Sequence, residues 1–388
     1  MGTMVTYQAT AGMRLLSKDE QDAIYDALYQ GLMDSERFVF RRMKRSDLAT
    51  LGGDMEGFYG AVAANYLTGL VDSKLRTGET TPATSTKKGP LGAMDMGGSS
   101  TQIVYMPGSE KPKHQQDDED DIPSRLDEDD FFAVSHLAYG CDTMRLRLWD
   151  TWVQDHETGC IEEEAPEACN RDQPILNPCA FEGYELEHKG YKLLGTGNAE
   201  ECVQEVQRLI PHHEADAERS TRKVAGVSHP PLRGKFVAMS LYFFSLDSLR
   251  VLSEPDKAAH DALNNAWPSP SIQELHDALD GLCSRSWHDD LVHIQHNSHT
   301  YTRAEVLPHR CFETVYMATL LRDGYGFAPE SRDITFTFLV DGSEVEWSLG
   351  MALTKHAEEY EATLAKQRAA ESNNTYQEEC RDDEPLLT

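Results

Sequence analysis

The run from Met94 to Gln102, Met-Asp-Met-Gly-Gly-Ser-Ser-Thr-Gln, constrains this chain more than any other part of it. An apolar approach ends on Asp95, two glycines and three hydroxyl residues follow, and an alternating run begins at Ile103. This order predicts a strand, a tight turn and a second strand. Glycine allows close approach of a ligand, and successive free N–H groups in such a turn bind anions. With an acid positioned to hold a cation, the run indicates a metal–phosphate site. It is not a P-loop, because no Gly-Lys-Ser/Thr follows.

Length and charge narrow the class of protein. The chain has 388 residues, 39% of them hydrophobic, which is enough for two or three lobes with a sizeable core. Expected strands and helices alternate, so the fold class is α/β. The formal charge of -30 argues against a nucleic-acid partner, whose phosphates need a positive surface. A nucleotide remains possible if a divalent cation bridges the repulsion.

The cysteines and the N-terminus give conflicting indications about the cellular compartment. None of the eight cysteines forms a Cys-x-x-Cys pair, so disulfides in an oxidising compartment are favoured over a zinc ribbon. Asn373-Asn374-Thr375 is one glycosylation sequon. No signal peptide is visible, and no apolar run reaches the ~20 residues of a membrane span. We therefore expect the natural N-terminus to lie upstream of Met1.

Periodicity and capping signals predict the elements between these landmarks. Polar or acidic composition predicts loops over 72–90 and 108–130, and the cysteine-rich stretch 160–202 is expected to be loop-rich. A turn is expected over 52–57 and a hairpin turn at 341–342. We expect strands over 5–10, 38–40, 131–134 and 334–340, and helices over 17–32, 59–67, 141–152, 271–283, 309–322 and 347–370.

Two further segments could carry chemistry. Glu56 follows a double glycine and opens a helix, where an acid is ordinarily favoured by the helix dipole. Beside a bound phosphate, however, its carboxylate could deprotonate a water molecule. Small residues from Ala9 to Gly12 would let a phosphate approach Thr10, although a plain strand-to-helix turn also explains them.

Aromatic and histidine clusters have simpler interpretations. Trp347 and the aromatic residues between Phe236 and Phe244 are expected in the core. Four histidines, His288, His293, His296 and His299, accompany two aspartates, but their irregular spacing favours a hydrated surface over a zinc site.

Five motifs occur in order: Ala-Thr-Ala-Gly-Met-Arg-Leu-Leu (9–16), Gly-Asp-Met-Glu-Gly-Phe-Tyr-Gly…Asn-Tyr-Leu (53–67), the run from Asp95 to Gln102, Phe-Val-Ala-Met-Ser (236–240) and Trp-Ser-Leu-Gly (347–350). Together they resemble the apyrase family, the nucleoside triphosphate diphosphohydrolases, including Golgi nucleoside-diphosphatase relatives. The likeness spans about residues 5 to 355.

The resemblance implies two actin-like, ribonuclease-H-like lobes with a nucleotide in the cleft between them. Residues 1–88 would form part of the first lobe, completed by 345–372, and residues 89–344 the second lobe with the phosphate hairpin and a disulfide-rich insert. Residues 373–388 would be a disordered tail. The first hairpin of the family, of the Asp-x-Gly-Ser-Ser-Gly-Thr type, is not found before Val5. We therefore expect an N-terminally incomplete first lobe and doubtful activity of this chain alone.

The resemblance also assigns site residues. It implies removal of terminal phosphates from nucleoside tri- and diphosphates with Ca²⁺ or Mg²⁺, and it makes Glu56 the residue that activates water. Asp95 would hold the metal through water, with Glu56, Gln102 and Trp347 contributing to the metal site. The remaining residues implied to bind the nucleotide or its phosphates are Thr10, Gly97, Gly98, Ser99, Ser100, Thr101, Gln102 and, near the base, Phe244.

Further implications concern disulfides, compartment and partners. The resemblance suggests the pairs Cys179–Cys202 and Cys283–Cys311, with Cys160–Cys169 less certain, and a place in the secretory pathway, in the Golgi or at the cell surface. Membrane attachment would come only from segments absent here, and the oligomeric state is open. Two alternatives remain: a catalytically inactive nucleotide-binding or interaction protein that retains one hairpin, and an actin-like phosphatase acting on exopolyphosphate.

Overall fold

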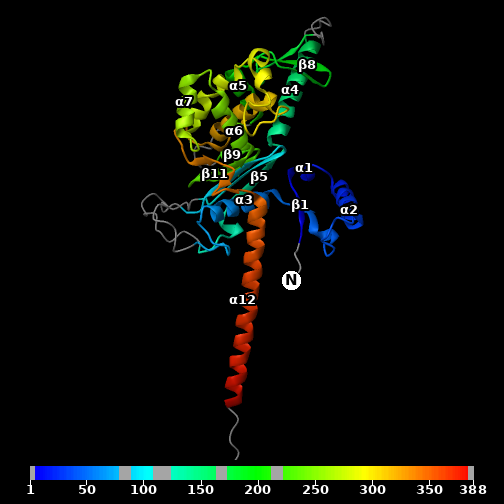
Figure 1. Cartoon of the computed structure of the whole chain (residues 1–388), viewed down its shortest axis with the longest axis vertical. Helices are drawn as coiled ribbons and strands as arrows, with labels where there is room; N and C mark the ends of the chain where they lie inside the picture. The colour runs from blue at the N-terminus through cyan, green and yellow to red at the C-terminus, as the bar shows by residue number, and fades with distance from the viewer. Residues whose placement is uncertain (1–4, 78–88, 108–123, 163–172, 211–221, 383–388) are drawn as a thin grey trace, which may run out of the picture.

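The computed structural model describes residues 5–77, 89–107, 124–162, 173–210 and 222–382, which form a mixed α/β fold (Figure 1). At its centre lies a five-stranded sheet with the order β12-β11-β3-β4-β5. Strands β3 (Gly92–Met96), β4 (Ser100–Tyr105) and β5 (Phe132–Leu137) are antiparallel neighbours. Strand β11 (Phe236–Ser240) runs parallel to β3, and β12 (Ile334–Phe336) runs parallel to β11. The β3–β4 pair is the hairpin that the sequence predicts.

Alternating side chains of this sheet supply two separate hydrophobic cores. Met94, Met96, Ile103 and Tyr105 face the larger core, which contains α4 (Cys141–Glu162), α6 (Leu241–Leu252) and α11 (Arg310–Thr319). The neighbouring positions of the same strands, such as Val104, face a smaller core made with α3 (Gly53–Leu67) and α12 (Trp347–Asp382). Because successive side chains of a strand point to opposite faces, the sheet separates these cores.

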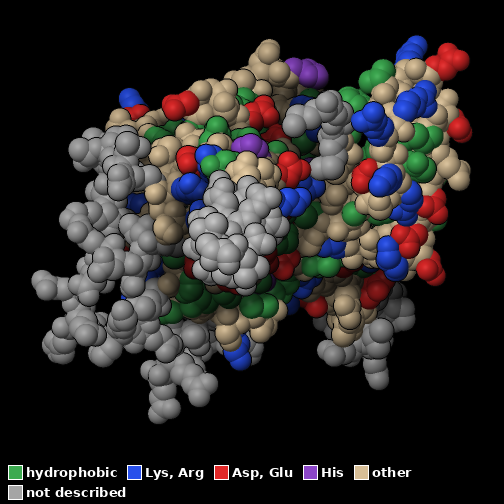
Figure 2. All heavy atoms as spheres, turned by 90° about the horizontal axis from the view of Figure 1, so that it is seen from below, with side chains coloured by type: hydrophobic (Ala, Val, Ile, Leu, Met, Phe, Trp, Pro, Cys, Tyr) green, Lys and Arg blue, Asp and Glu red, His purple; other side chains and the backbone are tan. Residues whose placement is uncertain are grey.

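The N-terminal residues form a third, small core beside the sheet (Figure 1). Strand β1 (Tyr7–Ala9) pairs in parallel with β2 (Leu48–Thr50), and α1 (Ala11–Arg14) and α2 (Lys18–Asp34) lie between them in the chain. The expected capping box of Ser17 and Glu20 begins α2. Seen from below, basic and acidic side chains lie intermixed over the surface (Figure 2).

The cysteine-bearing part is more regular than the sequence predicts. Residues 175–209 form a three-stranded sheet, β6 (Ile175–Asn177), β8 (Tyr191–Gly195) and β7 (Glu185–His188), followed by α5 (Ala199–Leu209). The expectation of a loop-rich stretch over 160–202 was therefore wrong for this part. These strands are only three to five residues long and depend on hydrogen bonds to β8, a contact that amino-acid composition does not reveal.

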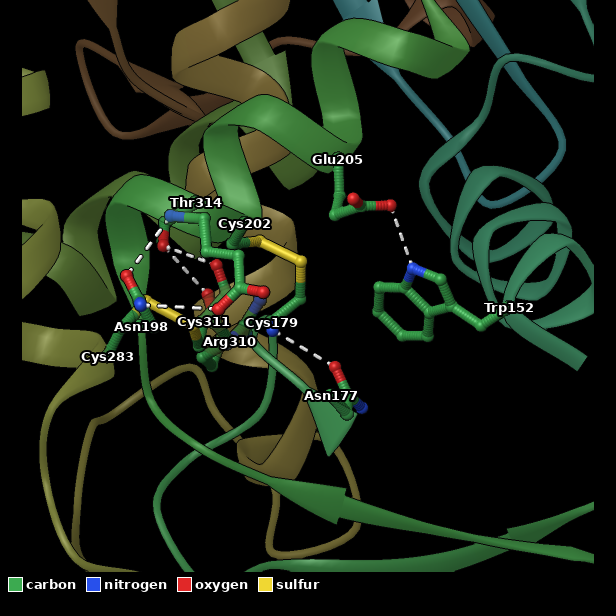
Figure 3. Close-up of a disulfide and its surroundings, with 11 residues drawn as sticks. Trp152, Asn177, Cys179, Asn198, Cys202, Glu205, Cys283, Arg310, Cys311 and Thr314 are labelled. Atoms are coloured by element: carbon green, nitrogen blue, oxygen red, sulfur yellow. Dashed lines mark hydrogen bonds between the residues drawn. A yellow bond between two sulfur atoms is a disulfide. The ribbon is translucent and has the colours of Figure 1, made fainter. Parts of the chain in front are cut away.

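Both disulfides implied by the resemblance are confirmed. Cys179, just after β6, joins Cys202 of α5, and Cys283 at the end of α9 (Leu279–Cys283) joins Cys311 of α11 (Figure 3). The Cys179 amide donates to Asn177 Oδ1 at 3.0 Å beside the first of these bonds. The third pair that the resemblance suggests, Cys160–Cys169, includes Cys169, which lies outside the described residues.

The remaining elements complete the larger lobe and its connections: η1 (Arg45–Asp47), η3 (Glu128–Asp130), β9 (Arg222–Val224), β10 (Val227–His229), α7 (Lys257–Ala266), α8 (Ile272–Asp277), α9 (Leu279–Cys283), η4 (Trp287–Leu291), α10 (Val292–Ile294), η5 (Leu307–His309), η6 (Leu320–Tyr325), β13 (Leu339–Val340) and β14 (Ser343–Glu344). Within the part of the chain described above, no helix combines the length and apolar character that crossing a membrane requires.

Several other expectations were wrong in detail. Residues 38–40 form no strand; Val39 is 74% exposed and has no neighbouring strand with which to pair. The expected turn over 52–57 is mostly helix, because α3 already begins at Gly53. His288, His293 and His296 are exposed as expected, but His299 is buried, with Nε2 2.8 Å from Asp247 Oδ2. Its hydrogen-bond partner, Asp247 of α6, lies 52 positions away, so the local spacing of the histidines gives no sign of the contact.

Candidate active site

The turn between β3 and β4 is held from behind by α4 and the end of β5. The Gly97 and Gly98 carbonyls accept hydrogen bonds from the Cys141 and Thr143 amides at 2.9 and 3.0 Å, and the Ser99 carbonyl accepts from the Ala138 amide at 2.8 Å. Among the described residues, none accepts a hydrogen bond from the Gly98 or Ser99 N–H group. Two unpaired amide donors on a rigid glycine turn have the chemistry of an anion site.

Glu56 lies in the first turn of α3, with its side chain only 8% exposed. Its Oε2 accepts from Arg14 Nη1 at 2.9 Å and from Gln102 Nε2 at 3.2 Å. Burial raises the pKa of the Glu56 carboxyl above its ordinary value, Arg14 opposes the rise, and the charge of Asp95 adds to it. The Glu56 carboxylate is thus shielded from solvent and bonded to Arg14 and Gln102. Gln102 lies on β4 directly opposite Asp95 of β3, the second acid of the site.

Gly57 explains how Glu56 comes so close to the hairpin. A Cβ atom at this position would lie 2.6 Å from Val104 Cγ2 and 3.2 Å from Gln102 Cβ. Only glycine lets α3 pack this tightly on β4, so the Glu-Gly pair places the acid against the strand. Sequence analysis of the motif suggests a turn, whereas the structure shows a close crossing of helix and strand.

Gln102 and Ser100 project from β4 toward Glu56. Gln102 Nε2 also donates to Ser100 Oγ at 2.7 Å and to Ser135 Oγ of β5 at 3.0 Å. The register pairs Asp95 with Gln102 and Ser135 with Gln102 across the three strands. Of the predicted residues, Glu56, Ser100 and Gln102 therefore form one hydrogen-bonded cluster.

Asp95 closes the row at the end of β3. Burial raises the pKa of its carboxyl, a hydrogen bond from the Ser240 hydroxyl lowers it, and the negative charge of Glu346 raises it again. Ser240 has φ +55° and ψ -130°, a strained conformation for a residue with a side chain, and it ends β11 beside β3. Strain of this kind is concentrated at functional sites because the surroundings must hold it in place.

Thr101 does not join the cluster. Its side chain lies on the opposite face of β4, where the hydroxyl donates to the Asp95 carbonyl at 2.9 Å and lies 3.4 Å from Tyr242 Oη. Alternation along the strand sends Ser100 and Gln102 to one face and Thr101 to the other. The geometry thus gives Thr101 a role in bracing the hairpin from the core and offers no support for contact with phosphate.

The other predicted residues lie around this cluster or apart from it. Thr10 precedes α1, and its carbonyl accepts from the Met13 amide at 3.0 Å. Trp347 begins α12 and is half-buried, next to the Glu346 charge that reaches Asp95. Phe244 packs against Tyr301 and Phe338, with ring centroids 5.7 and 5.5 Å away.

Two residues of the cluster were not singled out from the sequence: Arg14 and Ser135. Arg14 is part of the motif over 9–16, so that motif was the available signal, but its partner Ser135 lies 121 positions away along the chain. Nothing in the local sequence of β5 distinguishes Ser135 from an ordinary strand serine.

A hard divalent cation would find oxygen ligands here, but not a complete protein cage. Within the described ranges, no group of three or more His, Cys, Asp or Glu side chains could hold a metal ion. Arg14 and Gln102 bind Oε2 of Glu56, which leaves Oε1 of Glu56 and the Asp95 carboxylate as the acidic oxygens that could face an ion. These donors fit a hydrated ion held through water.

Comparison of structures addresses the fold. The crystal structure of nucleoside triphosphate hydrolases from Neospora caninum matches with a TM-score of 0.58 and 16% identity, over 91% of this chain and 72% of that one. This likeness confirms the expected α/β fold class.

Comparison of sequences shows the family. The model of the GDA1/CD39 (nucleoside phosphatase) family matches residues 1–369, and the chain belongs to this family. It is 28% identical to ectonucleoside triphosphate diphosphohydrolase 1 of Rattus norvegicus over 367 residues, 90% of this chain and 65% of that protein. Ectonucleoside triphosphate diphosphohydrolase 8 of Bos taurus is also 28% identical, over 89% of this chain and 65% of its own length. The chain thus spans 65% of the length of these curated relatives.

Proposed function

We propose that this chain hydrolyses the terminal phosphate of nucleoside tri- or diphosphates in a reaction that depends on a divalent cation. The observation that carries the proposal is the buried Glu56 carboxylate, bound to Arg14 and Gln102 beside the glycine turn. The family and the names of its diphosphohydrolase relatives support this substrate class.

Each group of the site has a role in the proposed reaction. Glu56 takes a proton from an attacking water molecule, and its raised pKa brings it closer to the range in which a general base works best. The free amides of Gly98 and Ser99 and the Ser100 hydroxyl bind phosphate oxygens in this scheme. Gly97 lines the same turn, but its amide already donates to the Ser100 carbonyl at 2.9 Å. A bound calcium or magnesium ion would neutralise charge on those oxygens at Asp95, with Gln102 and Trp347 nearby. Thr10 and Phe244 remain proposals for the attacked phosphate and the base.

Cellular placement and lobe boundaries belong to the same proposal. We infer a secretory or cell-surface location, supported by the two disulfides and by relatives named ectonucleoside hydrolases. The proposed second lobe, 89–344, contains the sheet and the hairpin, and α12 would return to the first lobe against α3.

Phosphate release tests the function directly. The chain is incubated with ATP or ADP and with calcium, magnesium or a chelator, and inorganic phosphate is measured. Cation-dependent release that Glu56→Gln lowers by about 10²- to 10⁴-fold supports the proposal, because that range is typical of a general base. Equal rates for both proteins contradict it. Binding of a non-hydrolysable nucleotide without turnover selects the inactive binding protein instead.

A further inference from the structure

The guanidinium of Arg14 joins four separate parts of the candidate active site. Nη1 donates to the Leu51 carbonyl and to Glu56 Oε2, both at 2.9 Å. Nη2 donates to Ser100 Oγ at 3.1 Å and lies 3.4 Å from Ser135 Oγ. The side chain, only 14% exposed, therefore connects the loop before α3, α3 itself, β4 and β5.

The backbone around Arg14 leaves space for this arrangement. A Cβ atom on Gly53 would lie 3.3 Å from Arg14 Cζ and 2.3 Å from Ser135 Cβ. The first residue of α3 must therefore lack a side chain so that the guanidinium and Ser135 can meet. A surface arginine in a chance ion pair needs no such clearance.

The two carboxylate oxygens of Glu56 differ in their hydrogen bonds. Oε2 accepts from both Arg14 and Gln102, whereas no described residue donates to Oε1. One oxygen is anchored and the other is left for an incoming group, so the orientation of the carboxylate is set by its anchored side. A planar guanidinium can make such bonds in fixed directions, which an ammonium group on a flexible stem cannot.

We propose that Arg14 is a positioning residue, which orients Glu56 so that Oε1 faces the attacking water and which locks Ser100 of the phosphate hairpin to the same frame. This inference rests on the proposed hydrolytic function. Arg14 itself touches no reacting atom; it acts through Glu56 and Ser100.

A double-mutant cycle separates this role from a general contribution to folding. Arg14→Met and Arg14→Lys are made in the full chain, each with Glu56 intact and with Glu56→Gln, and phosphate release from ATP gives kcat and KM. Arg332→Met is the matched control, because Arg332 also binds a carboxylate, Glu274 at 2.6 Å, and a backbone carbonyl, but away from the site. Thermal unfolding is followed for all variants.

We expect Arg14→Met to lower kcat by about 10- to 100-fold, part of the general-base contribution, while KM changes by less than about 3-fold. Arg14→Lys restores only a minor part of the rate. In the Glu56→Gln background the Arg14→Met change costs less than about 2-fold, because there is no base left to orient. Arg332→Met leaves kcat unchanged.

Other outcomes overturn the inference in distinguishable ways. An Arg14→Met effect of equal size in both backgrounds shows a role independent of Glu56, and an unchanged kcat shows no role. Either result contradicts the positioning role and leaves the hydrolytic function intact. If the unmodified chain and Glu56→Gln release phosphate equally, the hydrolytic function fails and the role of Arg14 fails with it.

Discussion

Replacing Gly350 by alanine should separate two helices on which the candidate site depends. A Cβ atom at Gly350 of α12 would lie 1.8 Å from the carbonyl oxygen of Tyr59 in α3 and 2.6 Å from its carbonyl carbon. Carbon and oxygen atoms without a covalent link approach to ~3.3 Å, so the backbones must move apart by about 1.5 Å. The obstacle is backbone, which cannot rotate away as the end of a side chain can.

The cost can be worked from the same contacts. Overpacking of a buried site costs ~1–3 kcal/mol, and a rigid backbone neighbour places Gly350→Ala at the upper end. The helix propensity of alanine returns ~1 kcal/mol relative to glycine. We therefore expect a net loss of about 2 kcal/mol in the free energy of unfolding, with Leu353 and Ala357 of α12 losing part of their burial. Because Glu56 lies one turn before Tyr59, kcat should fall as well.

Urea unfolding followed by circular dichroism measures this loss. Gly31→Ala in α2 is the matched control, since nothing lies within 4 Å of a Cβ atom at that position. That variant should gain ~1 kcal/mol from helix propensity alone. If Gly350→Ala unfolds within ~0.5 kcal/mol of the unmodified chain, the close crossing of α3 and α12 is not as the structure shows it, since overpacking of that size must be felt.

Three further predictions test other parts of the molecule. Because burial raises the pKa of Glu56 and a base must be deprotonated, kcat should fall on acidification at a pH above the usual glutamate range, which a pH–rate profile measures. Burial lowers the pKa values of the His136 and His229 rings to about 3 and about 4. Their contribution to the free energy of unfolding should therefore be full above the unfolded pKa of ~6.5 and decline as the pH falls toward 4. Replacing both histidines by phenylalanine should flatten that decline, which urea titrations at several pH values measure. Exchange of Cys179 and Cys202 for serine should cost ~3 kcal/mol of unfolding free energy for a loop of 23 residues, while a loss below ~1 kcal/mol would contradict a closed bond.

Local patterns in the sequence predict the elements whose cause is local. The capping box at Ser17, the glycine turn after Met96 and the long helix from Trp347 all depend on residues adjacent in the chain. The strand expected over 38–40 fails for the opposite reason: aromatic and β-branched residues favour a strand only where another strand is available to pair. Conversely, β2 escaped notice because its partner β1 lies some forty positions earlier in the chain.

The residues of the candidate site also fall into those that local sequence indicates and those that only the tertiary fold brings in. Glu56, Asp95 and Gln102 come from motifs that a single segment displays, so the sequence indicates them. Arg14 and Ser135 enter only because α1, α3, β4 and β5 meet in space, with 121 positions between the two. Contacts across such separations are a product of the tertiary fold, and no window of the sequence contains both partners.

Register along β4 decides which chemistry the hairpin presents. Gln102 bonds Glu56, and Ser100 bonds Gln102, on the face of β4 opposite the one from which Ile103 and Tyr105 enter the larger core. Thr101 lies on the core side, next to Tyr242. A slip of one residue would turn every side chain of the strand to the other face, placing Thr101 and Ile103 against Glu56 and burying Gln102 among apolar groups. The Thr101 hydroxyl, bound to the Asp95 carbonyl at 2.9 Å, opposes that slip from inside the core. Thr101, which the resemblance assigned to phosphate binding, therefore supports the site from the core side of β4. Thr101→Val should lower kcat for phosphate release, because it loosens the register that holds Gln102 against Glu56, without altering any group that faces the nucleotide.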